Sequence, residues 1–559
     1  MSSKVEGRTV AEDSLQAAVA GGEPSSGSPR QRLLKALLSR PLAWRVEVPT
    51  CAALLAGVAF LVYRPHVGQG GFYSDDWANA SDYRYEGWRM AVNLWHHVLP
   101  GRPGLAALLP LPYALFGHNA QAHLAMAVCL GALTSLCFYV FLRALTLEPI
   151  HAASIAILAL IFPWSEAARL WPTASLNNLA VCAYLLGTVV ALHGLQFRGK
   201  RAVLTHGAAL ALYLFSLVTY EVAGCAIALS VVVYRVRTSL RHAATRWAAD
   251  LVLVVAVLSI SAAYTSNVRH VGSLSQRIHD IPAFSRQGLS IFASSFLPRA
   301  LDSATSERVA LVVLGAMIAY AVVVARDPTR ESLRRWLRVL AIAALGVAAA
   351  YVMFLGSTIF PSGRGLDTRL HVFAGLAFAT SCYATVVVAV ELVASERRVV
   401  VALAAGGSLV LGLGFADRLK SDSERWANAT RSQQTFVAAL KQTLPRPAAG
   451  STIFSFGYPG GEVRGLPIFS HNWDMNGVLR LTYHDPSLYG LPVYGRGAVV
   501  CQHTLVYATE FGPEHASRYR RTLFVDVRRR SVVRIDSERS CQRAIERFRP
   551  GPANVVDDW

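Results

Sequence analysis

The chain has 559 residues, of which 53% are hydrophobic and only 16% are charged. A soluble protein carries about 25% charged residues, so this composition excludes an ordinary soluble enzyme and indicates that lipid surrounds much of the chain. The formal net charge is +19, but the basic residues lie mostly in short loops between apolar runs, so no nucleic-acid partner is expected.

Residues 1–40 are polar, contain Ser, Gly and Pro, and have no apolar core, which is typical of a disordered cytosolic tail. Eleven apolar segments follow. Backbone groups in lipid must be satisfied within the segment, so we expect eleven membrane-spanning helices, of which the third and the sixth are short. The expected spans are residues 43–63, 120–142, 151–163, 177–196, 202–218, 222–234, 248–266, 309–325, 337–359, 371–393 and 399–415.

The density of basic residues in alternate loops predicts the orientation. One set of loops holds 15 Lys or Arg in 44 residues, and the other set holds 11 in 124. Cytosolic loops carry the excess of basic residues. We therefore expect a multi-pass protein of the bacterial plasma (inner) membrane, with its N-terminus in the cytosol and its C-terminal residues outside, on the periplasmic or extracytoplasmic side.

Two long outer loops and a C-terminal domain are predicted around the transmembrane domain of residues 41–416. The loop 64–119 is expected to hold two interfacial helices, near 77–97 and 104–117, and the loop 267–307 to lie in the membrane interface. Residues 417–559 are predicted to form a small extracytoplasmic α/β domain. The fold class is thus an all-α polytopic membrane protein with this added domain. Its expected elements are a helix over 420–444, a strand over 451–456 and a hairpin of 521–527 with 532–536.

Two of the eight cysteines, Cys501 and Cys541, fall in this C-terminal domain. An oxidising compartment permits a disulfide between them, and two unpaired thiols are the alternative. The other six lie in the spans and are read as small buried residues.

The motif Tyr73-Ser74-Asp75-Asp76-Trp77 follows the first span by about ten residues. Adjacent carboxylates repel each other, and one functional reason for such a pair is a general base tuned by a second acid. The alternative is helix capping, because Ser and Asp before a helical pattern are good capping residues. Local sequence leaves both interpretations open.

The position of this motif resembles that in GT-C glycosyltransferases, integral-membrane enzymes with an acid in the first outer loop. Leu217-Val218-Thr219-Tyr220-Glu221 is similar to a Leu-Ser-Lys-Glu junction of these families, with Tyr220 in place of the usual Lys, and Glu166 occupies the second outer loop. The resemblance implies an inverting glycosyltransferase that moves a sugar from a polyprenyl-phosphate donor to an envelope glycan, lipid or protein acceptor. Asp75 or Asp76 would be catalytic, with Glu166 and Glu221 as supporting acids.

Arginines on the outer side are candidates for holding the donor phosphate, because guanidinium groups bind phosphate through two hydrogen bonds. Juxtamembrane arginines also bind lipid headgroups or extend toward the interface, which is the structural alternative. The candidates are Arg364 and Arg369, then Arg269 and Arg277 in the loop 267–307, and Arg102 beside a turn.

Metal dependence stays open in the sequence. A divalent cation, Mg²⁺ or Mn²⁺, would be held by Asp76, Glu166 and Glu221 if one is used, but no spacing demands it. Two other functions also stay open. One is a lipid or sugar transporter (flippase), and the other is a polymerase or ligase of lipid-linked glycans that would act through the loop 267–307. Membrane lipids are expected partners in every case.

Overall fold

The computed structural model describes residues 29–265, 273–296, 304–355, 360–457, 461–463, 465–469, 471–493, 499–502, 505–509, 512–517, 519 and 521–548. The chain divides between Cys51 and Ala52 into two compact units, and the candidate site and the C-terminal domain lie in the second. Residues 29–40, predicted to belong to a disordered tail, instead form the first turns of α2 (Pro29–Gln69), since the run 33–38 is rich in strong helix formers. Residues 1–28 lie outside the described residues.

Nine helical segments within the described residues are long and apolar enough to cross a membrane, which confirms the polytopic helical architecture. Large apolar side chains such as Leu61, Val312 and Val410 are exposed on them, as lipid-facing residues are. The helices concerned are α2, α7 (Ala120–Ala144), α11 (Asn177–Gly194), α12 (Gly199–Thr219), α15 (Leu240–Thr265), α17 (Ala304–Val324), α18 (Glu331–Val352), α19 (His371–Val393) and α20 (Arg397–Thr443).

The other two predicted spans, the third and the sixth, are short helices. Residues 151–163 correspond to α8 (Pro149–Leu160), which is followed by the short helix η1 (Pro163–Ser165) because Pro163 cannot continue the hydrogen-bond pattern of α8. Residues 222–234 form two short pieces, α13 (Gly224–Ala228) and α14 (Ser230–Arg235). Both segments are helical, as predicted, but neither has the length of a full span.

The loop 64–119 contains four helices where two were predicted: α3 (Asp75–Glu86), α4 (Arg89–His97), α5 (Pro103–Leu108) and α6 (Pro110–Phe116). The first predicted helix is interrupted at Gly87, whose φ of 58° lies in the region that favours glycine. The second is interrupted where Pro110 starts a new helix. In the loop 267–307 the described residues include α16 (Leu274–Ser294).

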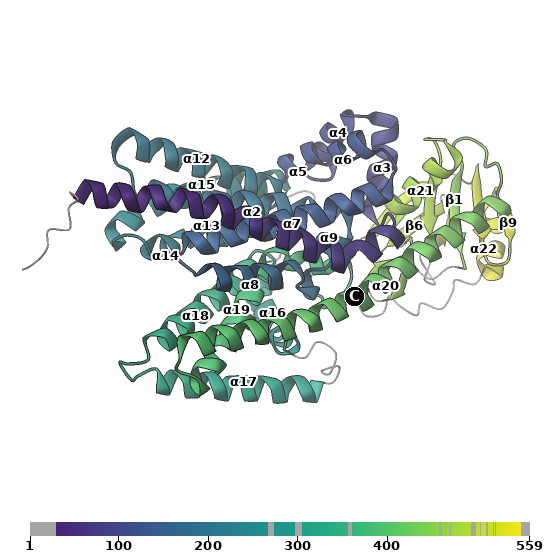
Figure 1. Ribbon diagram of the computed structural model, residues 1–559. Coiled ribbons are helices and arrows are strands. Elements are labelled where there is room, and N and C mark those ends of the chain that lie inside the picture. Colours follow the sequence, from purple (N-terminus) through teal and green to yellow (C-terminus); the bar gives the residue numbers. More distant parts are fainter. Residues whose placement is uncertain are drawn as a thin grey trace, which may run out of the picture. The chain divides into compact units, whose positions relative to one another are not determined.

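The last span continues into the C-terminal domain without a break. The 47 residues of α20 form one helix, about 70 Å long, that includes the predicted helix 420–444 (Figure 1). The domain's four-stranded sheet has the order β4-β1-β8-β9. Strand β1 (Thr452–Phe456) runs parallel to β4 (Tyr489–Pro492) and β8 (Thr522–Asp526), and β9 (Ser531–Ile535) is antiparallel to β8. The predicted strand and hairpin are therefore confirmed.

The C-terminal domain has its own hydrophobic core. Phe454, Phe456 and Phe524 pack with one another, while Ile453 and Val525 pack against α20 and against α21 (Asn472–Tyr483). A second small sheet consists of β5 (Val499–Cys501), β6 (Leu505–Thr509) and β7 (Gly512–Ser517). Cys501 at the end of β5 is disulfide-bonded to Cys541 in α22 (Glu538–Arg547), the pairing that the sequence left open. A short hairpin of β2 (Gly461–Val463) and β3 (Leu466–Pro467) completes the described strands.

Candidate active site

Asp76 is fully buried and is held by the backbone around it. Its Oδ1 accepts hydrogen bonds from the backbone N–H of Thr173 (2.9 Å) and from Thr173 Oγ1 (2.5 Å), and its Oδ2 accepts one from the N–H of Tyr73 (2.9 Å). Thr173 belongs to the short helix α10 (Pro172–Ser175). The Asp76 carboxylate thus ties the start of α3 to α10 and leaves no exposed surface for a substrate. These contacts indicate a structural role for Asp76.

Burial raises the pKa of Asp76 from its ordinary value to about 7, although the hydrogen bonds from Thr173 and Tyr73 oppose the shift. Because this folded-state pKa exceeds that of the unfolded chain, the contribution of Asp76 to stability is full at low pH. It is lost as the pH rises from about 4 toward 7.

Replacing Asp76 with Asn removes this titration. The melting temperature of the variant should therefore fall below that of the wild type by more at pH 5 than at pH 8. Thermal unfolding of both proteins at the two pH values checks this result. A deficit that grows toward pH 8 would show instead that the ionised carboxylate is the stabilising form.

Asp75 is the accessible acid of the pair. It is half-buried at the first position of α3, where the helix dipole favours a negative charge. Its Oδ1 accepts hydrogen bonds from Trp473 Nε1 (2.9 Å) and Ser74 Oγ (3.3 Å). Within the described part of the chain no group donates to its other oxygen. Asp75 is therefore a carboxylate that is oriented through one oxygen and has the other available to take a proton.

Backbone strain lies directly beside this acid. Ser74 has a φ of 43°, which is sparsely populated for residues with a side chain. Its side chain does not cap α3, so simple capping does not explain the motif. Strained residues of this kind concentrate at functional sites, where the surrounding structure holds them.

Aromatic and basic side chains form a series of contacts that starts at Asp75, and we call this set, with Asp75, the aspartate site: Trp473, His471, Arg369 and Trp171. The His471 ring stacks on Trp473 with ring centroids 4.1 Å apart. Burial lowers the pKa of His471. The charge of Asp75 raises this pKa and the charge of Arg369 lowers it, so the His471 ring lies within the electrostatic influence of both residues. The Arg369 guanidinium lies over the Trp171 ring, 5.2 Å from its centroid.

The C-terminal domain contributes to this site through a backbone contact. Helix α21, which carries Trp473, packs on α3 at Gly477. A Cβ atom at Gly477 would lie 2.2 Å from the carbonyl oxygen of Trp77, so only glycine permits this approach.

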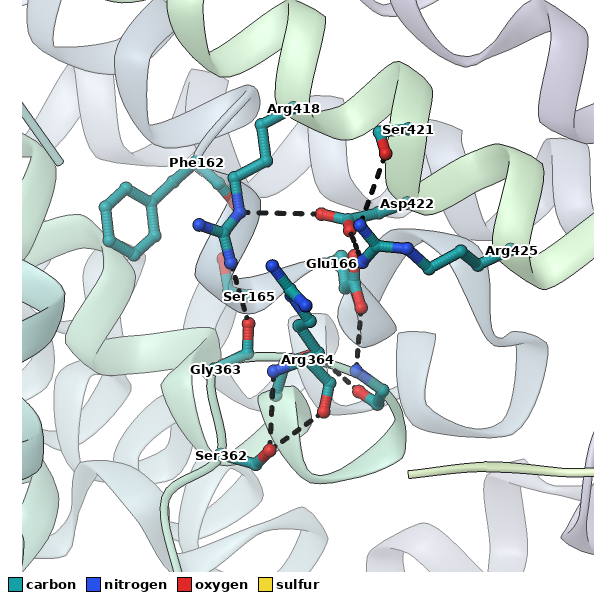
Figure 2. A network of polar contacts seen from close by, with 12 residues as sticks. Phe162, Ser165, Glu166, Ser362, Gly363, Arg364, Arg418, Ser421, Asp422 and Arg425 are labelled. Atoms are coloured by element: carbon teal, nitrogen blue, oxygen red, sulfur yellow. Dashed lines mark hydrogen bonds and ion pairs between the residues drawn. The ribbon is translucent and has the colours of Figure 1, made fainter. Parts of the chain in front are cut away.

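A second group, the arginine cluster, consists of Arg364, Arg418 and Arg425 around the carboxylates of Glu166 and Asp422. Arg418 and Arg425 extend from α20, and the Arg364 side chain points toward Arg418 and Glu166 (Figure 2). Arg425 Nη1 lies 2.6 Å from Asp422 Oδ1, and Arg418 Nε lies 3.7 Å from Asp422 Oδ2. Arg364 is the exposed member of the cluster. Three arginines against two acids leave an excess of positive charge.

Glu166 is buried in this cluster. Its Oε1 accepts a hydrogen bond from the N–H of Gly365 (2.8 Å), and burial together with the nearby Asp422 raises its pKa well above the ordinary range. A protonated Glu166 would increase the net positive charge of the arginine cluster further. Such a cluster is suited to an anionic group with several oxygens.

One segment connects the two groups. The short helix η3 (Leu366–Leu370) carries Arg369 of the aspartate site, and it begins two residues after Arg364 of the arginine cluster. The Thr368 hydroxyl accepts a hydrogen bond from the N–H of Ala167, next to Glu166 (2.9 Å). The structure therefore places the predicted residues Asp75, Glu166, Arg364 and Arg369 around segments that touch each other.

Arg102 and Glu221 form a separate ion pair. Arg102 Nε and Nη2 donate to the two carboxylate oxygens of Glu221 at 2.7 and 2.5 Å, and the guanidinium lies over the Tyr220 ring. The sequence predicted a phosphate ligand and a supporting acid here. In the structure the two charges neutralise each other between α5 and the short helix η2 (Glu221–Ala223), and the roles expected from the sequence stay predictions.

The remaining predicted residues include two arginines of the loop 267–307. Arg277 is exposed on α16, and Arg269 lies outside the described residues. No group of three or more His, Cys, Asp or Glu side chains in the described part of the chain is arranged to hold a metal ion. Asp76 has its oxygens engaged by backbone and hydroxyl donors, and Glu221 by Arg102, so the cation considered from the sequence stays a prediction.

Sequence reasoning missed five residues that complete the site: Arg418, Asp422, Arg425, His471 and Trp473. Arg418 lies four residues before Asp422, and Ser421 lies four residues before Arg425. Because residues four apart are neighbours on a helix surface, the members of each pair lie side by side on α20. That spacing just beyond the last span was a usable signal. Nothing in the local sequence linked Trp473 to Asp75, 398 residues away.

Comparisons with known proteins give no match to a family model and none to a curated protein. The structure is similar to the Archaeoglobus fulgidus oligosaccharyltransferase tethered with an acceptor peptide, at 12% identity and TM-score 0.40, over 80% of this chain. The chain covers 64% of that protein's length. It is also similar to ArnT from Cupriavidus metallidurans over 80% of this chain and 86% of ArnT. The apo structure has 16% identity and TM-score 0.35, and the structure bound to undecaprenyl phosphate has 14% and 0.32.

At these TM-scores the likeness carries no conclusion about the reaction.

Proposed function

We propose that the chain is an inverting glycosyltransferase that moves a sugar from a polyprenyl-phosphate donor to an envelope glycan, lipid or protein acceptor. The observation that carries the proposal is the half-buried carboxylate of Asp75, held through one oxygen by Trp473, next to segments that bear a cluster of arginines. A base beside a phosphate-binding group is what glycosyl transfer from a lipid phosphate requires.

The reaction assigns one role to each group. The acceptor hydroxyl gives its proton to the unbonded oxygen of Asp75 while its own oxygen forms a bond to the anomeric carbon of the donor sugar. The bond from that carbon to the phosphate oxygen breaks with its electron pair, so negative charge grows on the leaving polyprenyl phosphate. Arg364 and Arg369 stabilise this charge. Attack opposite to the leaving group inverts the anomeric configuration.

Asp75 is proposed as the base in preference to Asp76 because of access. Asp76 is fully buried with three hydrogen-bond donors on its oxygens, whereas Asp75 keeps one oxygen available. Trp473 and His471 form an aromatic surface beside Asp75 on which a sugar ring can stack.

The proposed location is the bacterial inner membrane, with the aspartate site and the C-terminal domain outside the cytosol. Two observations support this orientation. The loops on the other side have the higher density of Lys and Arg, and the Cys501–Cys541 disulfide suits an oxidising compartment.

The test is a transfer assay with the full-length protein purified in detergent and returned to liposomes. Polyprenyl phosphates carrying different labelled sugars are supplied with membrane extracts as the acceptor. We expect one donor to be consumed, with release of free polyprenyl phosphate and of label in an acceptor, in amounts proportional to the protein. Movement of intact donor across the bilayer without release of polyprenyl phosphate would identify a transporter instead.

A further inference from the structure

Arg425 belongs to the arginine cluster but has no role in the reaction proposed above. Its Nη1 donates a hydrogen bond to Asp422 Oδ1 (2.6 Å), and its Nη2 donates one to Ser421 Oγ (3.2 Å). Both acceptors lie on α20 itself, three and four residues before Arg425, where side chains of one helix are neighbours. The guanidinium is therefore fixed at its two terminal nitrogens by its own helix.

This guanidinium keeps donors for a ligand. A guanidinium has five N–H groups, and in the described part of the chain Asp422 and Ser421 take two of those of Arg425. The side chain of Arg425 is 26% exposed, so a ligand can reach it. Arg425 is thus an oriented donor group that remains accessible.

Asp422 is buried, in contrast to Arg425. Its side chain is 3% exposed, so it can act on a ligand only through its neighbours. Besides Arg425 it contacts Arg418, whose Nε lies 3.7 Å from Asp422 Oδ2. Arg418 has two further anchors, the carbonyl oxygen of Gly363 (3.2 Å) and the Trp164 ring, whose centroid is 4.4 Å from the guanidinium. Loss of the Asp422 carboxylate would therefore change the position of Arg425 more than that of Arg418.

The charges of the arginine cluster favour an anion beside Arg425. Figure 2 shows the three guanidinium groups of the cluster around the carboxylates of Glu166 and Asp422. Guanidinium groups gathered in this way repel one another, and two carboxylates do not balance three of them. A phosphate can accept hydrogen bonds from several guanidinium groups at once, so its binding relieves this repulsion.

We propose that Arg425 is a further ligand of the donor phosphate and that Asp422 is the positioning residue that holds it for this contact. The inference rests on the proposed function, because it places the phosphate of the polyprenyl donor at the arginine cluster. Arg364 comes from the segment before η3 and Arg425 from α20, so the phosphate is held between two segments that are distant in the sequence.

The test measures binding, so it does not require a transfer activity. Full-length protein in a neutral detergent is titrated with farnesyl phosphate, a short polyprenyl phosphate, and with farnesol, and binding is followed by isothermal titration calorimetry. We expect saturable binding of farnesyl phosphate and much weaker binding of farnesol. Arg425→Gln should raise the Kd for farnesyl phosphate about 10- to 100-fold, the loss expected for hydrogen bonds to a charged group. The matched control Arg431→Gln removes the same charge from an exposed position on α20 and should bind like the wild type.

The positioning role of Asp422 is tested by its coupling to Arg425. Asp422→Asn and Ser421→Ala should each raise the Kd about 3- to 10-fold in the wild-type background, because each loosens one end of the guanidinium. In the Arg425→Gln background either change should alter the Kd by less than about 2-fold, since residues that act through a shared partner are not additive. Ser421→Ala changes no charge, so it decides the question even if Asp422→Asn fails to fold.

The other outcomes separate this inference from the proposed function. Wild-type affinity in Arg425→Gln, with weaker binding in Arg364→Gln, would overturn the role of Arg425 alone. Equal losses from Asp422→Asn in both backgrounds would show that Asp422 acts on the fold and not through Arg425. Tighter binding in Asp422→Asn would show that its carboxylate competes with the phosphate, which also overturns the positioning role. If neither arginine variant weakens binding, or the wild type does not bind farnesyl phosphate saturably, the donor site of the proposed function fails as well.

Discussion

Replacing Asp75 with Asn should lower the rate of glycosyl transfer by about 10³-fold and leave the protein folded. A positioned general base contributes about 10²–10⁴-fold, and Asn cannot accept the proton of the acceptor hydroxyl. Asn still accepts the hydrogen bond from Trp473 Nε1 through its amide oxygen, so the surroundings of the side chain are preserved. The measurement is kcat in the liposome assay at saturating donor, together with the melting temperature of both proteins.

The matched control is Glu86→Gln, which neutralises an exposed acid at the other end of α3. This variant should keep full activity. Asp75→Glu should be slower than the wild type but faster than Asp75→Asn, because it keeps a carboxylate in a shifted position. An Asp75→Asn protein with wild-type kcat would rule out Asp75 as the base. A simultaneous loss of folding would assign it a structural role.

Replacing Arg364 with Gln should raise the KM for the donor by about 10- to 100-fold. A hydrogen bond to a charged group contributes about 1.5–3 kcal/mol, and Arg364 is the exposed residue of the arginine cluster, where a lipid phosphate can reach it. The loss of ground-state binding raises KM, and kcat should fall as well because Arg364 also stabilises the charge that grows on the leaving phosphate. The measurement is the dependence of initial rate on donor concentration.

The control for this variant is Arg398→Gln. Arg398 is an exposed residue at the start of α20, away from the arginine cluster, and its replacement removes the same charge. Its KM should equal that of the wild type. Arg364→Lys should restore only part of the affinity, because an ammonium group cannot form the two parallel hydrogen bonds of a guanidinium. Unchanged donor affinity in Arg364→Gln would remove this cluster from the donor site.

Most of the membrane fold was predictable from the sequence because the solvent imposes it. Lipid leaves only helices for an apolar segment, so every predicted span forms helix within its described residues, and only the two short segments fall below the length of a span. Gly87 and Pro110 are residue types that commonly end or start helices. The sequence prediction nevertheless continued one helix through each of them, because the apolar pattern runs on past both residues. The start of α2 within the expected tail shows that a polar composition does not by itself exclude a helix.

The candidate site was predictable only in part, since local motifs reveal single residues and not their partners. Asp75, Glu166, Arg364 and Arg369 were found from position relative to the spans. The different surroundings of Asp75 and Asp76 could not be read from two adjacent identical residues, because Thr173 and Trp473 come from distant segments. Likewise, Arg102 and Glu221 were each sound candidates alone, and only their pairing across 119 positions shows that they neutralise each other.

The contact at Gly477 determines whether the C-terminal domain can be removed or exchanged without changing the surroundings of Asp75. Because the backbone of α21 rests directly on that of α3, Trp473 is supplied to Asp75 by a part of the chain that follows every span. A truncated protein ending after α20 would retain its transmembrane helices yet present Asp75 without its hydrogen-bond donor. Grafting of a foreign C-terminal module would succeed only if that module also brought a glycine to this point. The transmembrane part and the C-terminal domain therefore both contribute residues to the aspartate site.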